Sequence, residues 1–216
     1  MSNRIDVAWT IGRKTIQPLV RAFAPFHNYG KERLPQTGGC VIAVNHFSWI
    51  DPPVVGAASP RRVSFVAKVE AHRVPGLGQL IRAFGTIAIR RGESDREAVR
   101  QMLEAAQNGE VVGLFVEGTR QKSGEPGKVQ PGAAMVALQA GVPVIPMAIH
   151  GTQEWRPGNW KPISVAWGQP IAFEGLPKGG RGYRQASEQI EQEIRKLWEW
   201  LVEVHAQGRP KGLTPP

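Results

Sequence analysis

The sequence is poor in cysteine and in long hydrophobic runs. A single cysteine, Cys40, excludes an internal disulfide and a cysteine-based metal cluster, and suits a reducing compartment. One window, 129–153, lacks Asp, Glu, Lys and Arg, but Gly141, Pro143 and Pro146 interrupt it, so we expect a helix and a strand there rather than a transmembrane helix. The first residues lack the basic start and apolar run of a signal peptide.

Acidic residues are also scarce relative to basic ones. The 18 acidic residues are outnumbered by 27 Lys and Arg, which gives a formal net charge of +9. Such a charge favours an anionic partner: nucleic acid, an anionic membrane surface or a phosphorylated substrate. A hydrophobic content of 41% in 216 residues indicates one globular domain with a sizeable core.

Short apolar runs alternate with helical patterns through the middle of the chain. The runs predict strands over 40–44, 62–67, 86–89, 111–116, 142–149, 163–167 and 170–173. Helices are expected over 53–58, 76–84, 132–140 and 183–206, with another that begins at the capping box 94–97 and stops at Gly109. This alternation predicts an α/β fold, a single domain with a largely parallel mixed central sheet flanked by helices.

The two ends differ from this pattern. Segment 1–28 is expected to be an amphipathic helical segment, basic on one face, that suits either membrane docking or packing on its own domain. The folded domain is expected over 29–207, and 208–216 is expected to be a flexible tail. The charged side of helix 183–206, which carries Glu191 and Arg195, is expected to face solvent.

The stretch from Asn45 to Pro52 joins a predicted strand to a predicted helix. Asp51 stands at the expected helix cap, followed by proline, and His46 stands where the strand ends. A corner of this kind can bring a carboxylate and an imidazole together, which would leave one ring nitrogen free as a base. A polar turn with an ordinary cap would give the same residues, so both interpretations stay open at this point.

Polar and cationic residues follow several of the predicted strands. In a parallel sheet the carboxyl ends of the strands meet at one edge, where ligands gather. Lys68, the pair Arg90-Arg91 and the stretch Glu117-Gly118-Thr119-Arg120 stand at such ends. Gly118 allows close backbone approach and Arg120 offers a planar fork for phosphate. Each cation alone would be an ordinary surface residue; their repetition favours a phosphate site.

Four motifs in these positions resemble those of the glycerolipid acyltransferases typified by lysophosphatidic acid acyltransferase. The family's first motif is matched by Asn45, His46 and Asp51. Its later motifs are similar to 85–91, 115–121 and 142–146, in the family's order. Val116 and Gln121 depart from the residues usual in the third motif, and Arg90 departs from the second. These changes bear on the acceptor rather than on the class of reaction.

The resemblance implies acyl transfer from a thioester, acyl-CoA or acyl carrier protein, to the hydroxyl of a lysophospholipid such as 1-acylglycerol-3-phosphate. It implies His46 as general base and Asp51 as its orienting partner, with neither metal nor bound cofactor. Lys68, Arg91, Glu117, Gly118, Thr119 and Arg120 would bind the substrate, Arg120 foremost.

A lysolipid substrate further implies docking on an anionic membrane surface, at the cytoplasmic face of the cell membrane. Trp155 and Trp160 suit that interface, packing in the core or the wall of a substrate tunnel. Three alternatives follow: another lipid acceptor, a thioester hydrolase that uses the same pair, or a basic nucleic-acid-binding protein. The last is disfavoured because no zinc finger, RNA-recognition motif or aromatic–basic repeat is present.

Overall fold

The computed structural model describes residues 17, 18, 20–83, 85–89 and 96–216. Its centre is a seven-stranded sheet in the order β1-β7-β6-β2-β5-β3-β4. The strands are β1 Phe26–Tyr29, β2 Cys40–Val44, β3 Val63–Lys68, β4 Ile87–Ile89, β5 Val111–Phe115, β6 Val144–His150 and β7 Ile163–Trp167. Neighbouring strands are parallel except for the antiparallel pair β6–β7. The predicted α/β fold with a largely parallel mixed sheet is confirmed.

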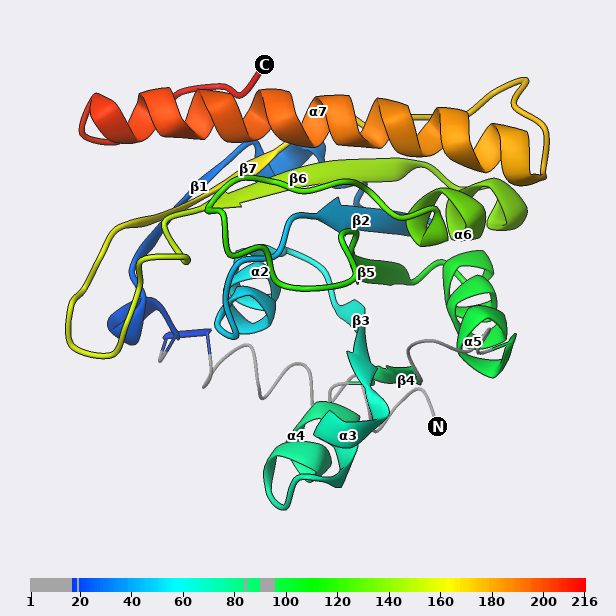
Figure 1. Cartoon of the computed structure of the whole chain (residues 1–216), viewed down its shortest axis with the longest axis horizontal. Helices are drawn as coiled ribbons and strands as arrows, with labels where there is room; N and C mark the ends of the chain where they lie inside the picture. The colour runs from blue at the N-terminus through cyan, green and yellow to red at the C-terminus, as the bar shows by residue number, and fades with distance from the viewer. Residues whose placement is uncertain (1–16, 19, 84, 90–95) are drawn as a thin grey trace.

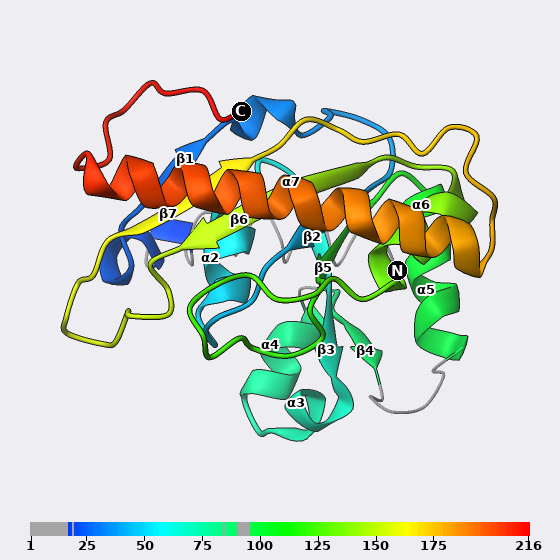
Figure 2. The ribbon, with the colours of Figure 1, turned by 45° about the horizontal axis from the view of Figure 1, so that its top comes forward.

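Helices cover both faces of this sheet (Figure 1). They are η1 Lys31–Arg33, α2 Asp51–Ala58, α3 Val69–Arg73, α4 Leu77–Ala83, α5 Arg96–Gln107, α6 Gly132–Ala140 and α7 Gly180–Ala206. Because side chains alternate along a strand, Ile42 and Val44 of β2 pack on the α2 side, whereas Val41 and Ala43 pack with residues of α5, α6 and α7. Figure 2 shows α7 crossing over β6 and β7.

Three elements differ from the expectations. β1 pairs with β7 and crosses the expected domain boundary at residue 28; its polar residues give no strand pattern, and it forms because β7 offers an open edge. The strand expected over 170–173 is reduced to a single bridge between Ile171 and Val144, since β6 is already paired with β2 and β7. The short helix α3 was not predicted.

The C-terminal segment 208–216 differs from the flexible tail that the sequence predicts. The Arg33 guanidinium donates hydrogen bonds to the carbonyls of Pro215 and Pro216, and the Tyr29 hydroxyl donates to that of Pro210. The segment therefore lies against β1 and η1. At the other end, most of the expected amphipathic segment, residues 1–16 and 19, lies outside the described residues.

None of the helices in the described part of the chain is long and apolar enough to cross a bilayer. The longest, α7, carries charged residues along its length and packs on the sheet through Ile190, Ile194 and Leu197.

Candidate active site

His46 and Asp51 meet at the corner between β2 and α2. The His46 Nδ1 lies 2.7 Å from the Asp51 Oδ2. The Asp51 side chain is fully buried, whereas the His46 side chain keeps 14% of its surface exposed. To donate to a carboxylate, Nδ1 must carry the proton, so the Nε2 lone pair of the neutral ring is free to accept one. The strand–turn–helix corner thus produces the arrangement that the sequence allowed.

The same Asp51 oxygen holds the backbone of this corner. The N–H groups of Phe47 and Ser48 both donate to Oδ2 at 2.7 Å. Asp51 is the first residue of α2 and Ile50 is its cap, with no side-chain capping bond. The expectation that Asp51 caps the helix is therefore wrong by one position. Its carboxylate serves the preceding loop instead, because three donors converge on one buried oxygen and stabilise its charge.

Asn45 anchors the residue that precedes His46. Its side-chain amide donates to the Ile149 carbonyl at 2.9 Å, and its side-chain oxygen accepts the Ile149 N–H at 2.8 Å. This pair continues the β2–β6 pairing beyond Val44 with a fully buried side chain. Asn45 therefore fixes the chain where it leaves the sheet, a structural role that supports the position of His46.

Glu117 bridges the corner and the loop that follows β5. One carboxylate oxygen accepts the His46 N–H at 2.9 Å and the other accepts the Gly127 N–H at 2.7 Å. Burial raises the pKa of Glu117 from its ordinary value of 4.5 to about 7, although these two hydrogen bonds act in the opposite direction. Glu117 was expected among the substrate-binding residues; in the structure it is buried and both of its oxygens bind backbone.

The loop after Glu117 and the last residue of β5 contact the histidine from two further sides. The Gln121 N–H donates to the His46 carbonyl at 2.7 Å, and the Phe115 ring centre lies 4.3 Å from that of the imidazole. Gly118 adopts the left-handed backbone conformation, φ 73°, that makes the turn into this loop. Thr119 and Arg120, which follow it, are exposed.

The remaining predicted cations are less constrained. Lys68 is exposed at the end of β3, where its register partner is Ile89 of β4. Within the described residues, neither the Lys68 nor the Arg120 side chain has a hydrogen bond or ion pair. Arg91 lies outside the described residues, as does Arg90. Figure 1 shows β3 and β4 projecting, with α3 and α4, away from the rest of the sheet.

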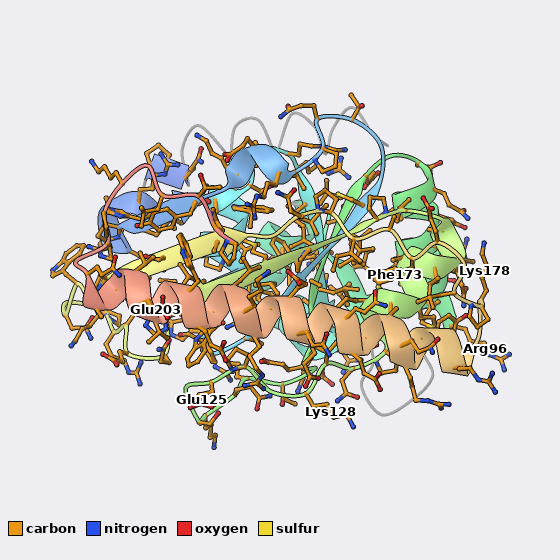
Figure 3. The ribbon with its side chains drawn as sticks, turned by 90° about the horizontal axis from the view of Figure 1, so that it is seen from above. Arg96, Glu125, Lys128, Phe173, Lys178 and Glu203 are labelled. Atoms are coloured by element: carbon orange, nitrogen blue, oxygen red, sulfur yellow. The ribbon has the colours of Figure 1, made fainter. Side chains whose placement is uncertain are left out.

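Helix α7 supports the loop from the other side. The Glu191 carboxylate accepts the Val129 N–H at 2.8 Å, and the Arg195 guanidinium donates to the Pro126 carbonyl at 3.3 Å. These contacts correct the expectation that this side of α7 faces only solvent. Figure 3 shows Glu125 and Lys128 of the same loop pointing outward from the molecule, so the loop is bound through its backbone.

A family model described as Acyltransferase matches residues 26–150, more than half of the chain. The chain belongs to the acyltransferase family. The matched segment contains His46, Asp51 and Glu117 with the elements that position them. It ends at the last residue of β6, so α7 and its contacts to the loop lie beyond it.

Individual acyltransferases show the same relationship. A 1-acyl-sn-glycerol-3-phosphate acyltransferase of Bacillus subtilis is 27% identical over 78% of this chain and 86% of its own. The enzyme of that name from Pseudomonas aeruginosa is 28% identical over 84% of this chain and 69% of its own. A lyso-ornithine lipid O-acyltransferase of Pseudomonas aeruginosa is 38% identical over 55% of this chain and 46% of its own. The crystal structure of the 1-acyl-sn-glycerophosphate acyltransferase of Thermotoga maritima superposes with a TM-score of 0.74 at 25% identity. The superposition covers 93% of this chain and 83% of the Thermotoga chain.

This acyltransferase contains site residues that the sequence alone did not assign. Glu191 and Arg195 looked like solvent-facing charges, and Gly127 looked like one of several loop glycines. Their contacts run between residues far apart in the chain, so no local pattern indicates them. Within the described residues, no three His, Cys, Asp or Glu side chains are grouped so as to hold a metal ion.

Proposed function

We propose that this acyltransferase moves a fatty acyl group from a thioester to the free hydroxyl of 1-acylglycerol-3-phosphate, which gives phosphatidic acid. The observation that carries the proposal is the 2.7 Å contact between His46 and the fully buried Asp51, in a histidine whose ring is partly exposed. The similarity to 1-acyl-sn-glycerol-3-phosphate acyltransferases over most of the chain supports the choice of acceptor.

In this mechanism His46 is the general base. Its Nε2 takes the proton of the acceptor hydroxyl as the oxygen attacks the thioester carbonyl, and the Asp51 carboxylate stabilises the imidazolium that forms. The tetrahedral intermediate collapses with cleavage of the carbon–sulfur bond, and the imidazolium returns its proton to the thiolate. The products are the ester and a free thiol, from either acyl-CoA or acyl carrier protein.

The acceptor phosphate needs cations that are free to receive it. Arg120 and Lys68 are exposed and unpaired within the described residues, and Arg91 is proposed with them from the sequence. Arg120 follows the Gly118 turn only three residues after Glu117, which binds the His46 backbone, so a phosphate held there would present its glycerol to the base. Gly118 and Thr119 would contribute backbone or hydroxyl contacts. Glu117 is better suited to hold the two loops together than to meet a phosphate, because both of its oxygens are already bonded.

A different lipid acceptor is the second candidate. The identity of 38% to a lyso-ornithine lipid O-acyltransferase is higher than to the glycerophosphate enzymes from the two bacteria above, but it spans only 55% of this chain. An amino-acid lipid has no phosphate for Arg120 to bind. The two acceptors therefore predict different effects of removing Arg120: a raised acceptor KM if the acceptor carries a phosphate, and an unchanged acceptor KM if it does not.

The site of action is proposed to be a membrane. A lysolipid resides in a bilayer, and the net charge of +9 favours an anionic surface. Peripheral attachment at the cytoplasmic face of the cell membrane is the expected arrangement.

Product analysis tests the proposal. Purified protein is incubated with acyl-CoA or acyl carrier protein thioesters and a panel of lysolipids, and the lipids are identified by mass spectrometry. Phosphatidic acid as the main product supports the proposal, and acylated lyso-ornithine lipid as the main product supports the second candidate. Thiol release at the same rate with and without acceptor would indicate a hydrolase, and absence of thioester turnover with tight, salt-dependent DNA binding would contradict the enzyme assignment.

A further inference from the structure

Three large aromatic side chains lie exposed close to the catalytic corner. Phe23, Trp49 and Trp160 keep 57%, 59% and 53% of their surfaces exposed, although folding normally buries most of such side chains. Phe23 ends the N-terminal helical residues, Trp49 lies in the loop between His46 and Asp51, and Trp160 lies in the loop between β6 and β7. Figures 1 and 2 place these three segments on the same side of the molecule.

The three exposed rings form one continuous set around a buried fourth ring. Phe23 stacks on Trp160 with ring centres 6.3 Å apart and planes within 10°. The Trp155 indole, only 4% exposed, donates to the Phe23 carbonyl, and its ring meets Trp49 edge-on at 5.7 Å. We call Phe23, Trp49 and Trp160 the aromatic patch. Trp155 supports the patch from below. Of the two loop tryptophans, Trp155 is therefore packed in the core, whereas Trp160 is exposed.

Exposed cations lie close in the sequence to the aromatic patch and its support. Arg21, Arg156 and Lys161 are exposed beside Phe23, Trp155 and Trp160, respectively. The Arg156 guanidinium is directed by hydrogen bonds to the carbonyls of Gln153 and Trp155. Glu154 pairs with Lys161 at 3.5 Å, and the charges of Arg21 and Arg156 remain in excess of this one carboxylate. Exposed aromatic rings with a cationic border are the composition that proteins use at the headgroup region of anionic bilayers.

We propose that the aromatic patch docks on the headgroup region of an anionic lipid bilayer and turns the catalytic corner toward it. This proposal rests on the proposed function, because it assumes that the acceptor is a lipid. A bilayer fits better than a protein partner because the patch is continuous through Trp49 with the loop that carries His46, and the substrate must enter there from lipid. Docking through this patch would let a lysolipid move from the membrane to His46 without crossing water.

Vesicle binding of a double variant, Phe23→Ala with Trp160→Ala, tests the proposal. The full-length protein is mixed with vesicles of phosphatidylcholine and phosphatidylglycerol, and the bound fraction is measured by sedimentation. Loss of two half-exposed rings is expected to weaken the partition constant at least about tenfold. Val202→Ala is the matched control, since Val202 is also exposed, at 38%, but lies on α7. It should bind like the wild type.

Acyl transfer in detergent micelles separates the two proposals. There the double variant is expected to match the wild type, since neither residue contacts His46 or Asp51, whereas on vesicles it should be slower. If the double variant is unstable, Trp160→Asn replaces it, because asparagine tolerates the left-handed backbone at this position, φ 48°. Unchanged vesicle binding, or an equal loss in Val202→Ala, would overturn the docking proposal. No acyl transfer by the wild type in micelles would instead overturn the proposed function.

Discussion

The corner around His46 and the cations proposed to receive the acceptor are built in opposite ways. At the corner, buried Asp51 and Glu117 accept from the backbone N–H groups of Phe47, Ser48, His46 and Gly127. Lys68 and Arg120 are exposed and make no side-chain hydrogen bond or ion pair within the described residues. Under the proposed mechanism, the difference separates the residues that must stay fixed during the reaction from those that must be free to bind and release a substrate.

Physical chemistry explains this division. A general base contributes only if its nitrogen is held within hydrogen-bond reach of the acceptor hydroxyl, so its supporting groups are placed in the core. A phosphate-binding cation that was already paired would have to break that pair first. Substitutions in the two regions should therefore differ in kind: those at the corner should affect rate and stability, and those among the cations should affect KM.

The largest effect is expected for His46→Ala. Removal of the general base should lower kcat/KM by about 10²–10⁴-fold. It should also lower the thermal stability, because the Asp51 Oδ2 loses one of its three donors and the Phe115 ring loses the imidazole that lies beside it. Steady-state acyl transfer and thermal unfolding are the measurements. His72→Ala is the control, a histidine on α3 outside the corner, and it should retain activity.

Asp51→Asn should impair both rate and folding. Asparagine is uncharged and cannot support the imidazolium, and its amide can turn a donor toward the N–H groups of Phe47 and Ser48. We expect a rate loss of at least about tenfold and a loss of about 1–3 kcal/mol in the free energy of unfolding, measured by denaturant titration. Glu125→Gln, at an exposed position, is the control. A stable but inactive Asp51→Asn protein would show that the backbone contacts matter little.

Glu117→Gln should change the pH dependence of stability. Since the pKa of Glu117 is raised from 4.5 to about 7, the folded protein holds this proton more tightly than the unfolded chain between those values. The contribution of Glu117 to stability therefore falls as the pH rises from about 4.5 to about 7. Unfolding titrations at pH 5 and 7.5 should show a smaller fall in the variant, which should also be less stable at pH 5 because an amide donor meets an N–H group. An identical pH dependence of the free energy of unfolding in the wild type and the variant would contradict the raised pKa of Glu117.

Arg120→Ala should raise KM for 1-acylglycerol-3-phosphate about tenfold while the free energy of unfolding and KM for the thioester hardly change. Lys68→Ala should act in the same direction and less strongly. Lys122→Ala, an exposed lysine in the same loop, is the matched control. An unchanged acceptor KM in Arg120→Ala would favour an acceptor without phosphate.

The smallest effect is expected for Glu191→Gln. The amide oxygen can still accept the Val129 N–H, so only the charge of that contact is lost, and the loop should be destabilised by less than about 1 kcal/mol. A slight rise in acceptor KM, measured beside Glu188→Gln on the exposed side of α7, would show that α7 positions the loop. Equal acceptor KM values in the two variants would show that the contact of Glu191 with the loop does not influence acceptor binding.

The sequence predicted the sheet and the approach of His46 to Asp51 better than it predicted the residues that hold this corner in place. β2, β5 and β7 follow apolar runs, so local pattern was sufficient to locate them. The approach of His46 to Asp51 was predictable as a possibility because both lie at one strand–helix corner. β1 was not predictable, since its polar residues pair only because β7 presents an edge to them.

Long-range contacts account for what the sequence missed at the site. Glu117 looks like part of a phosphate loop until the fold places its oxygens against the N–H groups of His46 and Gly127. Glu191 is separated from its partner Val129 by 62 residues, and helical periodicity places it on the polar side. Asn45 was identified by motif, but its pairing with Ile149 depends on β6 lying beside β2.

Thiol release from an acyl thioester, measured with and without 1-acylglycerol-3-phosphate in the wild type and in His46→Ala, tests the central claim most directly. The wild type should release thiol rapidly only when the acceptor is present, with one phosphatidic acid formed per thiol. His46→Ala, folded and still able to bind the acceptor, should lose that release by at least about a hundredfold. Acceptor-dependent release that persists undiminished in His46→Ala would contradict the assignment of His46 as the base.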